Sequence, residues 1–89
     1  MYTIILKGKA RKDYKKLQAS VFAKKGNQLI HQIQLEPHDI VGLEKLHFAA
    51  DTYAARINGQ HRLVFTLDRE HDSAAIISAW SHYQAIETK

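Results

Sequence analysis

The stretch that decides the fold is YAARINGQHRLVF, residues 53–65. Its outer segments are rich in apolar, β-branched and aromatic residues, and the Asn58-Gly59 pair between them is a strong hairpin signal. The sequence therefore predicts two antiparallel strands, Tyr53–Asn58 and His61–Leu67, that are joined by a tight turn.

The two faces of this hairpin decide its register. A two-residue loop would place Arg62 opposite Ala55, among apolar side chains. A three-residue loop instead pairs Tyr53 with Phe65 on the apolar face and sets Arg56 directly opposite Arg62 on the other face. Because burial of one consistent face fixes strand register, we expect the three-residue loop. Two like charges side by side normally destabilise a strand pair, and an anion bound between them would remove that cost.

The segments around the hairpin predict an α+β domain. Tyr2–Leu6 and Ala74–His82 have the composition of strands. Over residues 9–36 the apolar residues recur at spacings of three and four, which predicts two amphipathic helices. We therefore expect one domain over residues 1–89, with two N-terminal helices packed on one face of a twisted antiparallel sheet of about four strands. The hairpin and the last strand together occupy residues 53–83.

The joint between the helices and the segment after them are less regular. Gly26 falls where the two helices could meet, so one bent helix and a helical hairpin are both compatible with the pattern. We favour the hairpin, with Ser20 capping the second helix. Pro37 ends that helix, and residues 37–51 show little periodicity. A loop of that length in a small domain is often functional.

Composition excludes several classes of protein. At 45% hydrophobic and 25% charged residues, the chain has the composition of an ordinary globular domain. It has no cysteine, which excludes a disulfide framework, a thiolate zinc site and a cysteine nucleophile. No window approaches the roughly 18 apolar residues of a membrane helix, so we expect no membrane association and a cytoplasmic protein. The six histidines lack the spacing of metal ligands, and we expect no metal.

The net charge of +4 is concentrated near the N-terminus. Residues 1–25 carry eight basic side chains and one acidic one, a net of +7, whereas residues 26–89 carry five basic and eight acidic ones, a net of −3. A basic surface in one short segment is typical of proteins that bind a polyanion, although a solvated helix face has the same pattern.

Polar residues along the second half of the chain resemble those of a known family. The chain contains, in order, Glu44-Lys45-Leu46, Arg56-Ile57-Asn58, His61-Arg62-Leu63-Val64-Phe65 and Ser81-His82-Tyr83. This order resembles that of the YoeB/Txe-type toxins of the RelE/ParE superfamily, the toxin halves of bacterial toxin–antitoxin pairs. The resemblance implies a RelE/ParE-like, microbial-RNase-like fold. It also implies a ribosome-dependent endoribonuclease that cuts messenger RNA in the decoding site and needs no cofactor.

The resemblance also implies a role for individual residues. Glu44 would be the general base, His82 the general acid and Arg62 the support for the phosphate; Tyr83 would help to position it, and Arg56 would be a second phosphate contact. These side chains suit the chemistry, because attack by the 2′-hydroxyl of RNA needs a base, cationic support for the phosphorane and an acid for the leaving oxygen. Histidine is readily poised as an acid near neutral pH, and paired arginines can hold phosphate oxygens.

Two further groups of residues receive an interpretation. The basic segment would contact ribosomal RNA phosphates through Lys7, Lys9, Arg11, Lys12, Lys15 and Lys16. His61, on the face opposite Arg62, and Trp80 are interpreted as structural, with Trp80 in the core.

The resemblance implies partners as well. These are a small YefM/Axe-like antitoxin, the ribosome with its messenger RNA, and operator DNA through the antitoxin complex alone; relatives are often dimers. An acidic antitoxin segment would complement the basic N-terminal surface. Two alternatives remain: a ParE-like toxin that poisons DNA gyrase without cutting RNA, and a decayed toxin that acts only as antitoxin partner or co-repressor.

The chain departs from the family pattern at three places. His47–Ala55 lacks the Gly-x-Trp-Ser type of sequence found before the hairpin, and Ala55 stands where a further arginine is often found. The spacing from Glu44 to Arg56 is about one residue short. Residues 84–89 extend past the His-Tyr pair as a tail.

Overall fold

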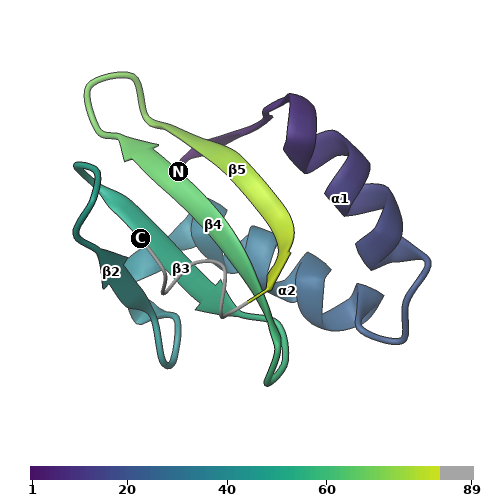
Figure 1. The fold of residues 1–89 in the computed structure, drawn as a ribbon. Helices are drawn as coiled ribbons and strands as arrows, with labels where there is room; N and C mark the ends of the chain where they lie inside the picture. Colours follow the sequence, from purple (N-terminus) through teal and green to yellow (C-terminus); the bar gives the residue numbers. More distant parts are fainter. Residues whose placement is uncertain (83–89) are drawn as a thin grey trace.

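Two helices pack on a five-stranded sheet in the computed structural model, which describes residues 1–82, and residues 1–80 with their side chains (Figure 1). The elements are β1 (Thr3–Leu6), α1 (Gly8–Gln18), α2 (Ala23–Leu35), the 3-10 helix η1 (Pro37–Asp39), β2 (Glu44–Leu46), β3 (Thr52–Arg56), β4 (His61–Asp68) and β5 (Ser73–His82). Helix α1 lies against β5, and α2 runs behind the sheet in the view of Figure 1. None of the helices in the described part is long and apolar enough to cross a membrane.

The sheet is larger than expected and is mixed rather than antiparallel. Its strand order is β1-β5-β4-β3-β2, and β1 runs parallel to β5. Between these two strands the chain passes through both helices and then through β2, β3 and β4. Alternation within a single strand does not reveal such a pairing of the first strand with the last. The additional strand, β2, lies inside the segment 37–51 that was expected to be a loop. Its three residues are too few to show a pattern, and pairing with β3 holds them in place.

The predicted register of the central hairpin is confirmed. Tyr53 pairs with Phe65 and Arg56 pairs with Arg62. In the turn, the Asn58 side-chain oxygen accepts hydrogen bonds from the backbone N–H groups of Gln60, at 2.8 Å, and of the next residue, at 2.9 Å. An asparagine that bonds its own turn in this way fixes the three-residue loop.

One hydrophobic core joins both helices to the sheet. Its largest fully buried side chains include Leu17 of α1, Ile33 of α2 and Phe65 of β4. Further members are Ala10, Leu29, Tyr53, Ala55, Ile57, Leu63, Leu67, Ala74, Ile76 and Ala79. The apolar side chains that give the helices their periodicity and the strands their alternation therefore form a single core.

The helices form a hairpin, as favoured, but the joint lies earlier than predicted. Residues 19–22 connect α1 to α2, and Gly26 lies inside α2, where it is buried. A Cβ atom at this position would lie 2.8 Å from Leu17 Cγ, so glycine is needed for the close approach of the helices. Ser20 is not the cap of α2: its hydroxyl donates to the Leu17 carbonyl oxygen and accepts from the Phe22 N–H, which closes the turn before the helix begins.

A buried carboxylate fastens α1 to β5. Asp13, 6% exposed, accepts hydrogen bonds at Oδ2 from Lys9 Nζ at 2.7 Å, Ser78 Oγ at 3.0 Å and the Ala79 N–H at 3.3 Å. Burial alone would raise the pKa of Asp13, but these three donors outweigh it and hold the pKa below its ordinary value. Lys9, expected to contact RNA, is thus also part of the helix–sheet contact.

The contact between Gly26 and Leu17 generates a first prediction. Replacing Gly26 with Ala should lower the free energy of unfolding by about 1–3 kcal/mol, because the added methyl group forces the two helices apart. Gly8→Ala is the matched control, since nothing lies within 4 Å of its added Cβ atom. Urea unfolding of both variants measures the difference. If Gly26→Ala proves as stable as Gly8→Ala, the close approach does not constrain the helices.

The buried Asp13 generates a second prediction, on pH. Because its pKa is lower in the folded protein than the ordinary 3.8, the carboxylate contributes stability above that value and loses it as the pH falls through the folded pKa. Asp13→Asn should therefore cost about 1–3 kcal/mol at pH 7, and the gap to wild type should close below about pH 4.

Denaturant unfolding across this pH range measures the effect, with Asp39→Asn on η1 as an exposed control. A gap that stays constant with pH would show that the charge of Asp13 is not what binds the helix to the sheet.

Candidate active site

The centre of the site is Arg62, whose side chain is 4% exposed. Its Nη1 donates to the backbone carbonyl oxygens of Asn58, at 2.8 Å, and of His61, at 3.3 Å. Both acceptors belong to the hairpin turn, so the three-residue loop that sets the strand register also fixes the guanidinium group. Arg62 is buried although it lies on the face opposite Tyr53 and Phe65, because turn carbonyls and a carboxylate allow this charge to be buried.

That carboxylate is Glu44. Its Oε1 lies 3.7 Å from Arg62 Nε, and the glutamate side chain is 48% exposed. Glu44 was expected in a loop, but it is the first residue of β2, where it pairs with Ala54 of β3. The short strand therefore holds the carboxylate at a defined place, beside the buried guanidinium group and open to solvent.

Arg56 completes the group that the sheet brings together. It pairs directly with Arg62, and it lies two residues beyond Ala54, the partner of Glu44. Residues two apart on a strand share a face, and so do cross-strand partners. Glu44, Arg56 and Arg62 thus lie on one face of the hairpin, opposite the core residues Tyr53 and Phe65. Arg56 is exposed, in contrast to Arg62.

The last strand brings a further predicted residue to this end of the sheet. The backbone of His82 pairs with that of His61, and Ser81 pairs with Arg62. The end of β5 therefore lies next to the hairpin turn. The structure describes His82 by its backbone alone, and Tyr83 and the tail 84–89 lie outside the described residues.

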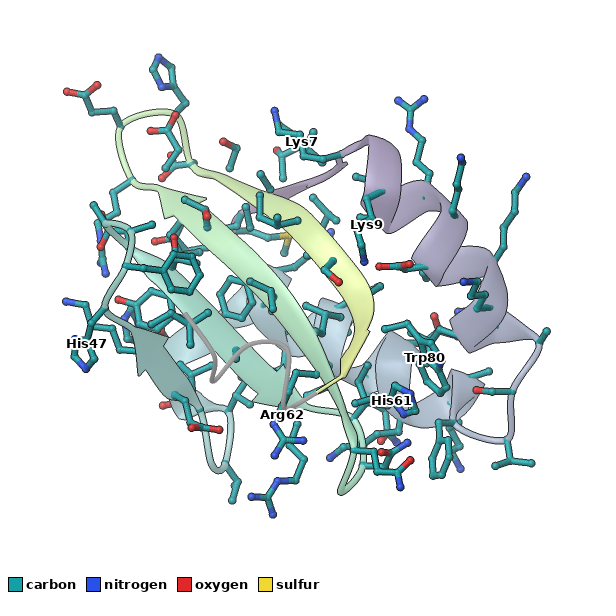
Figure 2. The ribbon with its side chains drawn as sticks, in the orientation of Figure 1. Lys7, Lys9, His47, His61, Arg62 and Trp80 are labelled. Atoms are coloured by element: carbon teal, nitrogen blue, oxygen red, sulfur yellow. The ribbon has the colours of Figure 1, made fainter. Side chains whose placement is uncertain are left out.

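The structural interpretation of His61 fits its contacts. Its ring stacks on Trp80 of β5, with centroids 3.9 Å apart and planes 13° apart, and Trp80 also meets Phe22 at 6.3 Å (Figure 2). Trp80 is half-buried at the edge of the core rather than inside it. The stack ties the hairpin to β5 beside Arg62.

The basic residues of the first helix lie elsewhere. Lys7, Lys9, Arg11, Lys12, Lys15 and Lys16 are exposed on α1 or just before it. This helix packs on β5, whereas Glu44 lies on β2 at the other edge of the sheet. Figure 2 shows Lys7 and Lys9 well apart from Arg62. The structure therefore presents two separate basic regions, and the lysines do not enter the arginine site.

A group of possible metal ligands lies at the far end of β4. Asp68, Glu70 and His71 bring potential ligand atoms within 4.8 Å of one another in the turn before β5, and all three are exposed. The His71 ring lies 2.8 Å from Asp68 Oδ2, and this hydrogen bond lowers the pKa of Asp68. The strand separates this turn from Arg62, so the group takes no part in the candidate active site.

One cation that the sequence left without a role lies close to the site. Lys25 of α2 lines a cavity together with Arg56. The helical pattern does not predict this, because Lys25 is one of two successive exposed lysines and comes to share a cavity with Arg56 only through the packing of α2 against the sheet.

Several solved structures are similar to this chain, although no family model and no curated protein matches it. YoeB in the heterotetrameric YoeB–YefM toxin–antitoxin complex of Staphylococcus aureus is 33% identical, with a TM-score of 0.75 over 93% of this chain and 99% of that chain. The YoeB dimer of the same organism is 33% identical, with a TM-score of 0.75 over 92% and 98%. The RelBE2 toxin–antitoxin complex of Mycobacterium tuberculosis is 28% identical, with a TM-score of 0.67 over 86% of each chain.

The two YoeB structures span almost the whole of both chains. The α+β fold of this chain, two helices on a five-stranded mixed sheet, matches theirs. The chain therefore belongs to the YoeB toxins of the RelE/ParE superfamily.

Proposed function

We propose that the protein is the toxin of a type II toxin–antitoxin pair and cleaves messenger RNA in the decoding site of the ribosome. The cut would be made by the 2′-hydroxyl of the RNA itself, in an endoribonuclease reaction that needs no metal. The observation that supports this most is the pairing of the half-exposed Glu44 carboxylate with the buried Arg62 guanidinium group, 3.7 Å apart, next to Arg56.

The two arginines suit a phosphate that gains charge during the reaction. Two backbone carbonyls orient Arg62 before any substrate arrives, so its guanidinium group would not need to reorganise. Arg56 would neutralise a second phosphate oxygen from the strand opposite. A bound phosphate would also relieve the repulsion between two arginines that face each other across the strand pair.

Glu44 is suited to take the proton of the attacking hydroxyl. A carboxylate beside the guanidinium group that holds the phosphate would lie near the 2′-oxygen of the preceding ribose, and its exposure gives the substrate access. We assign the proton transfer to the leaving 5′-oxygen to His82, whose backbone closes β5 next to the turn. Tyr83 is assigned to positioning of the phosphate.

The partners follow from the relatives. YoeB of Staphylococcus aureus is bound to YefM in its complex and also forms a dimer. We propose a small YefM-like antitoxin for this protein, operator DNA binding through that complex, and a homodimer. The exposed lysines and Arg11 of the α1 segment would contact ribosomal RNA phosphates in the cytoplasm.

The cleavage assay uses ribosomes programmed with a defined codon in the decoding site, purified protein and excess chelator. We expect a cut within that codon and a 2′,3′-cyclic phosphate on the upstream fragment, because the 2′-oxygen is the nucleophile. Mapping of the fragment ends measures both. Intact messenger RNA from folded protein would refute the nuclease, and inhibition of gyrase supercoiling by the same protein would then assign it to the gyrase-poisoning toxins.

Single substitutions test the roles in the same assay. Glu44→Gln should slow cleavage by about 10²–10⁴-fold, the usual contribution of a general base, with unchanged circular dichroism. Lys45→Ala is the control, since Lys45 neighbours Glu44 but pairs with Tyr53. Arg62→Lys should also lose cleavage, because lysine keeps the charge but not the planar fork. A Glu44→Gln protein that cuts at the wild-type rate would remove the glutamate from the mechanism.

A further inference from the structure

A cavity of about 360 Å³ opens beside the arginine pair. Its walls are Lys25 of α2, Val41 and Gly42 between η1 and β2, and Arg56 and Ile57 at the end of β3. Three segments that are distant in sequence thus bring two cations to one concave surface. All the described side chains that line it are basic or apolar, so no carboxylate there competes for the cations.

The two cations are available to a ligand. Lys25 and Arg56 are both exposed, and neither takes part in an ion pair within residues 1–80. In the same part of the chain Lys9, Arg62 and Arg69 each have a carboxylate partner. Two cations that line one cavity favour an anion strongly, because each strengthens the local positive potential of the other.

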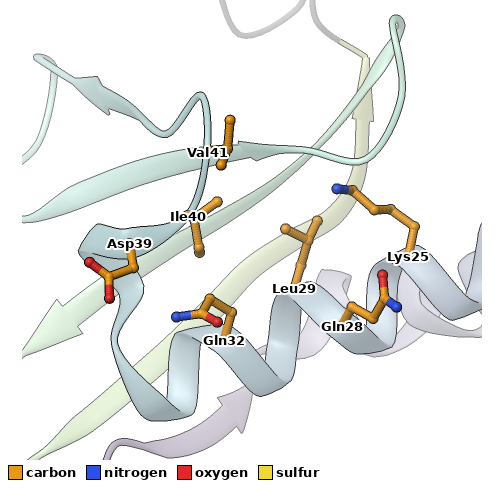
Figure 3. A pocket seen from close by; sticks show the side chains of 7 residues that line it. All are labelled: Lys25, Gln28, Leu29, Gln32, Asp39, Ile40 and Val41. Atoms are coloured by element: carbon orange, nitrogen blue, oxygen red, sulfur yellow. The ribbon is translucent and has the colours of Figure 1, made fainter.

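A neighbouring cavity limits where the anion binds. It measures about 240 Å³, shares Lys25 and Val41 with the first, and continues along α2 past Leu29 to Asp39 (Figure 3). In Figure 3 the ammonium group of Lys25 extends from one end of this cavity, and Asp39 lies at the other end. A phosphate is favoured at the Lys25 end and repelled at the Asp39 end.

Arg56 connects the first cavity, of about 360 Å³, to the candidate active site. It lines the cavity and pairs directly with Arg62 across the strands. The three cations Arg62, Arg56 and Lys25 thus follow one another from β4 to β3 to α2. A line of this type suits a chain of successive phosphates, which single-stranded RNA presents along its backbone.

We propose that Lys25 forms a second phosphate subsite, which binds the RNA phosphate next to the one that reacts, with Arg56 lying between the two phosphates and contacting both. The inference rests on the proposed nuclease function. Lys25 positions the substrate in this subsite and does not touch the reacting atoms.

The experiment compares Lys25→Gln with Lys24→Gln on programmed ribosomes. Lys24 is the matched control because it is the adjacent residue of α2, is exposed, carries the same charge and does not line the cavity. Lys25→Gln should lower kcat/KM by about tenfold, the effect of one charge-assisted hydrogen bond, and Lys24→Gln should leave it near wild type. Circular dichroism checks that both variants are folded.

A modified messenger RNA identifies the phosphate. Neutral methylphosphonate groups replace, one at a time, the phosphates on either side of the scissile one. At one of these positions the wild-type and Lys24→Gln proteins should lose at least tenfold in kcat/KM, whereas Lys25→Gln should lose clearly less, because its own contact is already absent and only that of Arg56 is left to lose.

Equal losses for Lys24→Gln and Lys25→Gln would show a general charge effect and overturn the subsite. Unchanged cleavage by Lys25→Gln, with weaker binding of an oligoglutamate peptide, would assign the cavity to a protein partner and also overturn it. The proposed function is judged separately, since its failure is an inactive wild-type protein.

Discussion

Burial of the apolar face of the β3–β4 hairpin is the constraint on which the rest of the site depends. Because side chains alternate along a strand, burial of Tyr53 and Phe65 against the helices places Arg56 and Arg62 opposite each other on the other face of the hairpin. The same register requires the three-residue turn, and the carbonyls of that turn hold the Arg62 guanidinium group. Packing of the core thus offsets the repulsion between two like charges that face each other across the strand pair.

The packing of the two helices determines which surfaces of the sheet stay accessible. Close approach of α1 and α2 at Gly26, and the buried Asp13 between α1 and β5, hold both helices tightly to the core. This places the basic surface of α1 at one edge of the sheet and leaves the β2 edge to Glu44. The molecule therefore separates a broad region of exposed lysines from a small, ordered group of polar side chains. The first is suited to a large polyanion and the second to one phosphate.

Local sequence patterns predicted the register of the hairpin. They did not predict the features that depend on contacts between segments distant in sequence. Alternation in the hairpin was enough to predict the partner of every residue from Tyr53 to Arg56, because one face had to be buried. The three-residue strand β2 has no alternation to detect, and the parallel pairing of β1 depends on where β5 lies after two helices and three further strands.

Among the side chains of the site, too, some positions follow from strand alternation and others from tertiary packing. That Arg56 and Arg62 share a face follows from period two, and the sheet confirms it. The depth of Arg62 does not follow, because its burial depends on turn carbonyls and on a glutamate from another strand. The proximity of Lys25 to Arg56 is likewise a product of tertiary packing.

The stack of His61 on Trp80 has a spectroscopic consequence. Trp80 is the one tryptophan of the chain, and an imidazole ring lies parallel to it with centroids 3.9 Å apart. Protonation of His61 would place a cation on the face of the only strong fluorophore. Aromatic faces attract cations, and such a contact alters the fluorescence emission of the indole. Since His61 adjoins both the hairpin turn and Arg62, the intrinsic fluorescence of the unlabelled protein reports directly on the state of this corner of the molecule.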